Sequence, residues 1–507
     1  MLPPSYLDQM PDAFVQLWQQ VEEQILQDVA RRIGKMDAVT PTANWQLWRY
    51  QQTEALRNDV VKLLAKYTGK SEAAIRRLLL QAATEAMERE DAIYYHYDME
   101  PTPFEESAAL NNLLDAGARQ TCGTWQNLTA TTANTVTGAF ERTLDAAWLK
   151  VSTGAFDYKT AVKQAVDSLA DEMPMVTYPS GHKDSIEVAA RRAVLTGVNQ
   201  TCGKLQEARM DEMGCEFVET SAHGGARPSH AEWQGRQFHR GGAVTYKGKY
   251  YPDFYEATHY GSGDGIYGWN CSHTHFAIFP ELGAPPQWTR EELQELNARN
   301  IEWNGKKYTA YEISQMQRAR ERNVRRWKKR YLAEDAAGLD TTDSAVRLKA
   351  ARQSLAEFAQ ATGGRVDSAR TSVPKFGRSE AGKASYIVQK QTRFDAANKE
   401  LQQMREAGTI KAKGKLIESP PAPNEISFAS EHVLQRWAER GMGPMDAERI
   451  IRTSKIAMSQ RNGTQTCYYS EYGFVAIGQD GNVASIGPLD EGGKKLMEVV
   501  RKHGIPH

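Results

Sequence analysis

The sequence predicts a multidomain α+β protein with an elongated helical part at its start and an antiparallel sheet near its end. A chain of 507 residues is too long for one ordinary domain. Apolar residues recur at helical spacing to about residue 208, lose that spacing to about residue 286, and regain it from Thr289. The chain then closes with helices followed by short alternating strands. These observations indicate several folded parts of different class.

Residues 1–208 are predicted to form the elongated helical domain. In FVQLWQQVEEQILQDVARRIGK, apolar side chains recur three or four positions apart, as at Phe14, Leu17 and Val21. This spacing places them on one face of an amphipathic helix. Further stretches repeat the pattern, and the last of them is predicted to end at Gly214.

Residues 209–288 are predicted to form a small, irregular, β-rich domain, because Gly, Pro, His and aromatic residues replace the helical spacing. Nitrogen and sulfur ligands occur in two groups, His223 with His230, and Cys271 with His273 and His275. Hydrogen bonding and packing of these side chains is the favoured interpretation, since no C-x-x-C pair is present. A tetrahedral zinc site built from four of these five, His223, His230, Cys271 and His273, is the second interpretation. A hydrolase that uses Cys271 and a histidine is the third.

Residues 289–362 are predicted to form a basic helical connector, followed by a linker over 363–384 whose composition is small, polar and basic. The stretch QRARERNVRRWKKR carries eight basic residues and one acidic residue. In the first interpretation this helix exposes its charges to solvent or contacts an acidic partner. In the second interpretation it binds phosphate groups, and Trp327 stacks or packs there. The second interpretation assigns nucleic-acid binding to Arg322, Arg325, Arg326, Lys328, Lys329 and Arg330.

Residues 385–507 are predicted to form a compact α+β domain. A helix over 430–440 precedes a second helix that begins at Pro444. The strands TQTCYY, GFVAIG and NVASIG follow, and the Asp-Gly of QDGN predicts a hairpin between the last two. A terminal helix, GGKKLMEVVRKHG, closes the domain.

The helix SEHVLQRWAERG aligns an imidazole and two guanidinium groups. His432, Arg436 and Arg440 are four residues apart, so they point the same way. Such a face could bind a phosphate, because guanidinium groups remain charged and offer paired donors. The alternative is an ordinary surface helix that buries Trp437 and leaves its charges in solvent.

Composition and charge limit the classes of function that this chain can have. Lys and Arg number 63, as do Asp and Glu, so the net charge of zero predicts no general affinity for nucleic acid. Five cysteines without a regular framework are typical of a reducing compartment. We expect no signal peptide and no membrane segment, because no run of eighteen apolar residues occurs.

The central segments HGGARPSHAEWQGRQF, YPDFYEATHYGSGDG and GWNCSH resemble the phage minor capsid protein 2 family, which is allied to the Mu F-like minor head proteins. Two helical stretches, TANWQLWRYQQTEALRNDVVKLLAKYTGKS and VTYPSGHKDSIEVAARRAVLTGVNQTC, resemble the N-terminal part of the family. The resemblance implies a structural protein in the virion, facing the capsid interior at the portal vertex. Its implied partners are the portal and other head proteins, with packaged DNA nearby. It would occupy the host cytoplasm during assembly or after ejection.

The C-terminal segment SFASEHVLQRWAERGMGPMDAERIIRTSKIA and the strands after it resemble the phage-associated branch of the barnase–EndoU–RelE superfamily of small ribonucleases. This resemblance implies a metal-independent endoribonuclease without a cofactor, delivered as a toxin and paired with an immunity protein. Such cleavage needs a base for the 2′-OH proton and cations for the phosphorane. The implied catalytic residues are His432, Arg436 and Arg440, with Ser485 on the last strand. From their chemistry and positions, Glu439 is expected to orient or replace the base, and Tyr469 and Tyr472 are expected to stack on bases.

The alternative function is a purely structural head protein. Its C-terminal domain would then only bind nucleic acid or another head protein.

Overall fold

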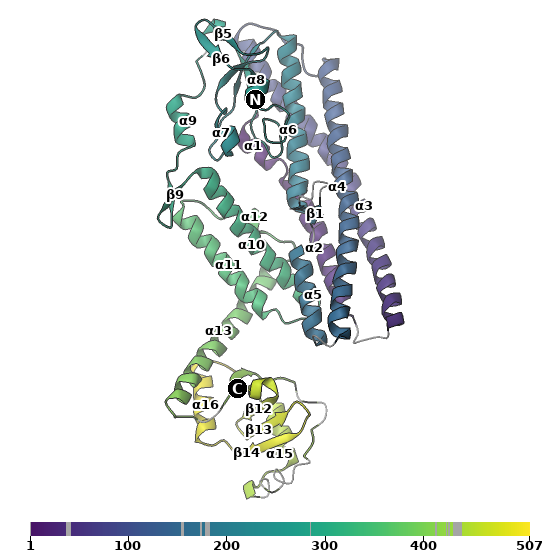
Figure 1. Cartoon of the computed structure of the whole chain (residues 1–507), viewed down its shortest axis with the longest axis vertical. Helices are drawn as coiled ribbons and strands as arrows, with labels where there is room; N and C mark the ends of the chain where they lie inside the picture. The colour runs from purple at the N-terminus through teal and green to yellow at the C-terminus, as the bar shows by residue number, and fades with distance from the viewer. Residues whose placement is uncertain are drawn as a thin grey trace. The chain divides into compact units, whose positions relative to one another are not determined.

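The computed structural model of the chain forms two compact units, residues 1–380 and 381–507 (Figure 1). Helices predominate, and the strands form small antiparallel sheets, as the predicted fold class requires. None of the described helices is long and apolar enough to cross a membrane. The structure describes residues 2–36, 42–153, 157–172, 175–177, 183–283, 285–410, 413–421, 423, 426–428, 435 and 439–506.

The first unit is built on long helices that pack around one apolar core. Figure 1 shows α3, α4 and α6 lying side by side. The N-terminal helices α1 and α2 and the shorter α5 complete the bundle, and the strand pair β1–β2 precedes α6. The bounds of these elements are α1 Pro4–Gln9, α2 Asp12–Gly34, α3 Thr42–His96, α4 Ala108–Ser152, α5 Tyr158–Glu172, β1 Met175–Thr177, β2 Lys183–Ser185 and α6 Ile186–Glu212.

Two glycines allow α4 and α6 to approach closely. A Cβ atom on Gly117 would lie 2.2 Å from the hydroxyl oxygen of Thr201, and one on Gly197 would lie 2.3 Å from that of Thr121. Each threonine hydroxyl donates a hydrogen bond to the backbone carbonyl four residues earlier on its own helix. The glycine of each helix therefore receives the threonine of the other, which explains why these positions have no side chain.

The central segment is β-rich, as predicted, and packs on the helices of the first unit. Its sheet has the antiparallel order β4–β3–β7, and β5 and β6 form a separate hairpin. The Glu90 carboxylate of α3 accepts hydrogen bonds from the Ala277 amide and the Gln206 side chain, so the sheet is attached to the helical bundle. The bounds are β3 Phe217–Thr220, α7 Pro228–Ala231, β4 Gln237–His239, β5 Val244–Tyr246, β6 Lys249–Tyr251, α8 Phe254–Ala257, β7 His275–Ile278 and η1 Pro280–Leu282.

The predicted connector contains a helical hairpin, and the segment after it is folded. Helix α10 packs on α11 and also against α2 and α5. Residues 363–384, predicted to be a linker, instead include the short helix α12 and the start of α13, and Val373 is buried. The bounds are α9 Arg290–Leu296, β8 Ile301–Trp303, β9 Lys306–Tyr308, α10 Ala310–Ala336, α11 Thr342–Ala361 and α12 Ser368–Thr371.

The second unit is a five-stranded antiparallel meander, β10–β11–β12–β13–β14, with an apolar core on each face. Helices α13 and α16 supply one core and α15 supplies the other. The sequence predicts only the last strands of this sheet. The bounds are α13 Arg378–Glu406, β10 Lys415–Glu418, α15 Pro444–Thr453, β11 Ile456–Gln460, η2 Arg461–Gly463, β12 Gln465–Ser470, β13 Gly473–Gly478, β14 Val483–Gly487 and α16 Glu491–Lys502.

Candidate functional site

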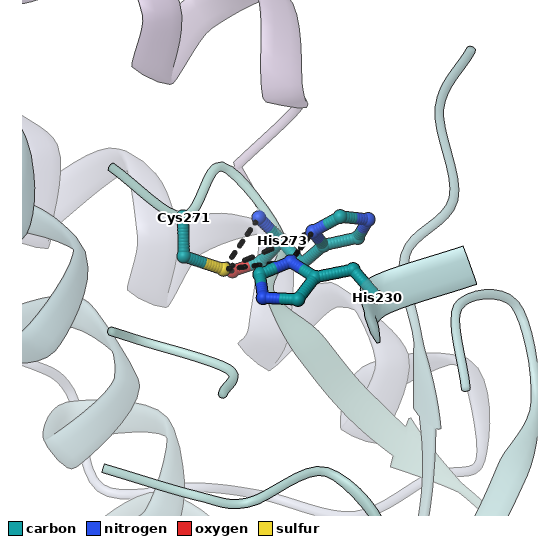
Figure 2. A group of neighbouring side chains, drawn as sticks. All are labelled: His230, Cys271 and His273. Atoms are coloured by element: carbon teal, nitrogen blue, oxygen red, sulfur yellow. Dashed lines mark hydrogen bonds between the residues drawn. The ribbon is translucent and has the colours of Figure 1, made fainter. Parts of the chain in front are cut away.

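Three of the four predicted metal ligands converge in the central segment (Figure 2). His230 lies on the short helix α7, and Cys271 and His273 lie just before β7. The two imidazole Nδ1 atoms are 3.2 Å apart, and the Cys271 Sγ atom is 3.9 Å from that of His230 and 3.8 Å from that of His273. All three side chains are buried.

Burial favours the uncharged forms of these three side chains. It lowers the pKa of His230 to about 4 and the pKa of His273 well below its usual value. It also raises the pKa of the Cys271 thiol to about 11. A nucleophilic cysteine requires a lowered pKa and access to substrate. The hydrolase interpretation of Cys271 is therefore not supported by its surroundings.

The fourth predicted ligand, His223, lies beside the cluster but not within it. Its ring packs against that of His273, with the ring centroids 4.3 Å apart. Its Nδ1 atom lies 3.1 Å from the backbone carbonyl of Gly224. The group of converging ligand atoms among the described residues contains only the other three side chains.

A second buried polar network lies in the same segment and was not predicted. The Glu207 carboxylate on α6 lies 2.9 Å from His275 Nε2 and accepts a hydrogen bond of 2.6 Å from the Tyr255 hydroxyl. The His275 Nδ1 atom is 2.6 Å from the Tyr267 hydroxyl. Arg240 forms an ion pair of 2.7 Å with Glu207. Sequence spacing gives no signal for this network, because its members come from the helices α6 and α8, the strand β7 and two loop positions far apart in the chain.

Replacing Glu207 with glutamine is expected to lower the free energy of unfolding of residues 1–380 by about 3 kcal/mol at pH 7. Burial alone would raise the pKa of Glu207, but hydrogen bonds and charges from His275, Tyr255 and Arg240 lower it from 4.5 to about 2. A lowered folded-state pKa stabilises the fold above the unfolded-state value, and the stabilisation is lost as the pH falls toward 2.

The difference in free energy of unfolding between wild type and Glu207→Gln should therefore have its full size at pH 7 and become smaller below pH 4.5. Denaturant unfolding followed by tryptophan fluorescence measures it, because ten of the eleven tryptophans lie in residues 1–380. Glu216→Gln, at a carboxylate that is 73% exposed, is the control. A difference of the same size at pH 7 and pH 3 would contradict the assignment.

The predicted nucleic-acid-binding helix directs most of its cations into the protein. Lys329 pairs with Glu22 of α2, and Arg325 pairs with Glu187 of α6 at 3.0 Å. Arg330 binds Asp167 of α5, with Nε and a carboxylate oxygen 3.0 Å apart. Lys328 is buried and donates to the Thr371 carbonyl at 2.5 Å. These four cations serve the packing of α10, which corrects their assignment to phosphate contacts.

Only Arg322 and Arg326 of the six predicted cations are exposed. Arg326 also lies 3.5 Å from the Asp171 carboxylate and stacks on Trp327, which is itself buried. A single free cation with one partly neutralised neighbour is a weak phosphate site. The charge of this helix is thus used mainly within the first unit.

The predicted catalytic set of the second unit is described only in part. His432 and Arg436 lie outside the described residues. Arg440 donates a hydrogen bond of 2.5 Å from Nη1 to the Ile486 carbonyl, the position after Ser485 on β14. Glu439 is exposed. The structure therefore brings Arg440 to the strand that carries Ser485, and the phosphate site itself stays a prediction.

The two tyrosines predicted to stack on bases have different positions. Tyr469 is buried in the core beneath α13 and α16, so it cannot stack on a nucleotide, and its assignment is corrected. Tyr472 is 38% exposed, and the Arg449 guanidinium lies 3.6 Å from the centroid of its ring. Tyr472 with Arg449 remains suited to base stacking.

A basic cavity of about 280 Å³ also occurs in the second unit, and the sequence did not reveal it. Its lining includes the cations Lys390, Arg393 and Lys455 and the hydroxyl groups of Ser419 and Ser454. The Lys390 ammonium is paired with Glu418 at 2.5 Å. The Ser454 hydroxyl already donates to the Tyr469 carbonyl at 2.8 Å, so the cations of this cavity are the groups suited to an anionic ligand.

Comparison with known proteins gives one match. A sequence model of the family described as Phage minor capsid protein 2 matches residues 2–360. No curated protein sequence and no solved structure shows significant similarity to the chain. The match covers nearly all of the first unit and stops before the second.

Proposed function

Because this chain belongs to the phage minor capsid protein 2 family, we propose that it is a head component at the portal vertex, with a C-terminal unit that cleaves RNA. Membership of the family implies a location in the virion and other head proteins as partners. The position at the portal, on the interior side, and the ribonuclease activity are the proposed parts.

The observation that supports a head role for the first unit is the extent of the family match, which covers residues 2–360. The ion pairs between α10 and the bundle make the predicted connector an integral part of this unit. Asymmetric reconstruction of intact particles tests the portal position. We expect density for residues 1–380 at the portal vertex. Density for these residues at the other vertices would contradict the proposed portal position.

The observation that supports RNA cleavage is the contact between Arg440 and β14 beside Ser485. In the proposed reaction His432 takes the 2′-OH proton, and the 2′-oxygen forms a bond to phosphorus. The bond from phosphorus to the 5′-oxygen then breaks, and the leaving 5′-oxygen takes a proton from solvent water while the proton on His432 passes to solvent. A 2′,3′-cyclic phosphate and a 5′-hydroxyl remain. Arg440 and Arg436 neutralise the negative charge that develops on the phosphorane oxygens.

The full chain incubated with RNA in the presence of chelator tests this proposal. We expect fragments that carry a 2′,3′-cyclic phosphate, and we expect no cleavage by His432→Ala. RNA that survives unchanged but is bound by the chain would favour the alternative, a C-terminal unit that only binds nucleic acid. The basic cavity and the Tyr472–Arg449 pair support that alternative. If the unit is an active toxin, an immunity protein is expected as its partner in the producing cell.

A further inference from the structure

The protonation of His230 is fixed by one backbone contact. Its Nε2 atom lies 2.8 Å from the carbonyl oxygen of Asp264. A carbonyl oxygen can only accept, so Nε2 must carry the hydrogen. A neutral imidazole has one N–H group, and the Nδ1 atom of His230 therefore presents a lone pair.

His273 is fixed in the same way by Gln234. The Oε1 atom of Gln234 accepts a hydrogen bond from the His223 backbone amide at 3.1 Å, and its Nε2 donates to Asn297 at 3.1 Å. These two bonds set the orientation of the amide. Because His273 Nε2 lies 3.1 Å from this Oε1, it must be the donor. The Nδ1 atom of His273 then also presents a lone pair.

Two lone pairs thus face each other across 3.2 Å inside the protein. Two acceptors at this distance repel unless a cation or a proton lies between them. The Cys271 Sγ atom completes the group and accepts the His273 backbone N–H at 3.3 Å. A thiol has a single hydrogen, so even a hydrogen-bonding Cys271 could satisfy only one of the two nitrogens. One of the two nitrogens therefore keeps a lone pair that no donor among the described residues satisfies, and a cation is the partner that both nitrogens and the sulfur can share.

We propose that His230 and His273, through Nδ1, and Cys271, through Sγ, bind one zinc ion. In a tetrahedral zinc site with Zn–N of about 2.0 Å and Zn–S of about 2.3 Å, the two nitrogens lie about 3.3 Å apart and the sulfur lies about 3.5 Å from each nitrogen. The corresponding distances here are 3.2, 3.8 and 3.9 Å. The Asp264 carbonyl and the Gln234 side-chain oxygen each accept a hydrogen bond from the Nε2 atom of one ring. Metal-bound histidines are commonly oriented by such a hydrogen bond from the nitrogen that does not bind the metal.

The fourth position is assigned to a water molecule. His223 packs its ring on His273, and its nitrogens do not join the group of three. The ion would join α7 to the segment before β7, positions 41 and 43 residues apart in the chain. The ion would therefore connect two loop-rich segments of the first unit.

Metal analysis of the purified full chain tests this proposal. Elemental mass spectrometry should find about one zinc per chain in wild type and in Cys122→Ser, which removes a thiol elsewhere. Cys271→Ser and His273→Ala should lose the zinc, and His223→Ala should retain it. Loss of zinc from His223→Ala would overturn the three-ligand assignment.

Cobalt substitution keeps the test valid if a variant folds poorly. Wild-type chain depleted of metal by chelation and supplied with Co²⁺ should show the absorption of tetrahedral cobalt with a thiolate charge-transfer band. Chelation should also lower the melting temperature of the first unit, and added Zn²⁺ should restore it. A folded wild-type chain that contains no zinc and binds neither Zn²⁺ nor Co²⁺ would overturn the proposal.

Discussion

Replacing Lys329 with alanine is expected to lower the free energy of unfolding of residues 1–380 by about 4 kcal/mol. Lys329 pairs with Glu22, whose side chain is only 1% exposed, and lies 3.9 Å from Glu187. Removing the ammonium leaves a buried carboxylate without its partner, and such a charge is strongly destabilising. The pair also joins α10 to α2, so its loss weakens the contact between the connector and the bundle.

The matched control is Arg322→Ala on the same helix. Arg322 is exposed, so its removal should change the free energy of unfolding by no more than about 0.5 kcal/mol. A third variant, Lys329→Met with Glu22→Leu, removes both charges and should recover much of the lost stability. Tryptophan fluorescence during urea unfolding measures all three. Equal stability of Lys329→Ala and Arg322→Ala would show that the buried pair contributes nothing.

Replacing Arg440 with alanine is expected to slow RNA cleavage by about 100-fold to 1,000-fold. The proposed role of Arg440 is to offset charge on the phosphorane, and its guanidinium already lies at β14 beside Ser485. Arg440→Lys keeps the charge but loses the paired donors, so it should restore only part of the rate. Cleavage of end-labelled RNA by the full chain in chelator gives the rates.

The control for this variant is Arg452→Ala, which removes an exposed arginine from α15 in the same unit. Its rate should equal that of wild type. RNA with a 2′-deoxy group at the cleaved position should resist the wild-type chain, because the attacking oxygen is absent. Equal rates for Arg440→Ala and wild type, or cleavage of the deoxy substrate, would exclude the proposed reaction.

Local sequence patterns predict the helices and strands better than they predict which residues pack against them. The helical spacing around Phe14 and Val21 corresponds to α2, and the predicted strand GFVAIG corresponds to β13. The cations of α10 were predicted with no knowledge of what faces them, and Lys329 meets a carboxylate 307 residues away. Charge pattern cannot reveal such a partner, which is why a buried packing surface resembled a nucleic-acid-binding helix.

The candidate sites also show that residue type alone does not predict which side chains the fold brings together. Residue type selected His230, Cys271 and His273, which the fold brings together, but also His223, which it leaves beside them. Strand alternation in TQTCYY cannot tell which face lies under α13 and α16, so the buried Tyr469 was assigned to base stacking. The orienting groups behind the imidazoles, from Gln234 and Asp264, carry no sequence signal at all.

The central claim is that the first unit carries the head function and the second unit carries a separate activity. The most direct measurement is quantitative mass spectrometry of particles assembled with a chain that ends after Glu380. The truncated chain should be incorporated as efficiently as the full chain, while the particles lose the chelator-resistant ribonuclease activity. Particles that exclude the truncated chain but incorporate residues 381–507 alone would contradict it.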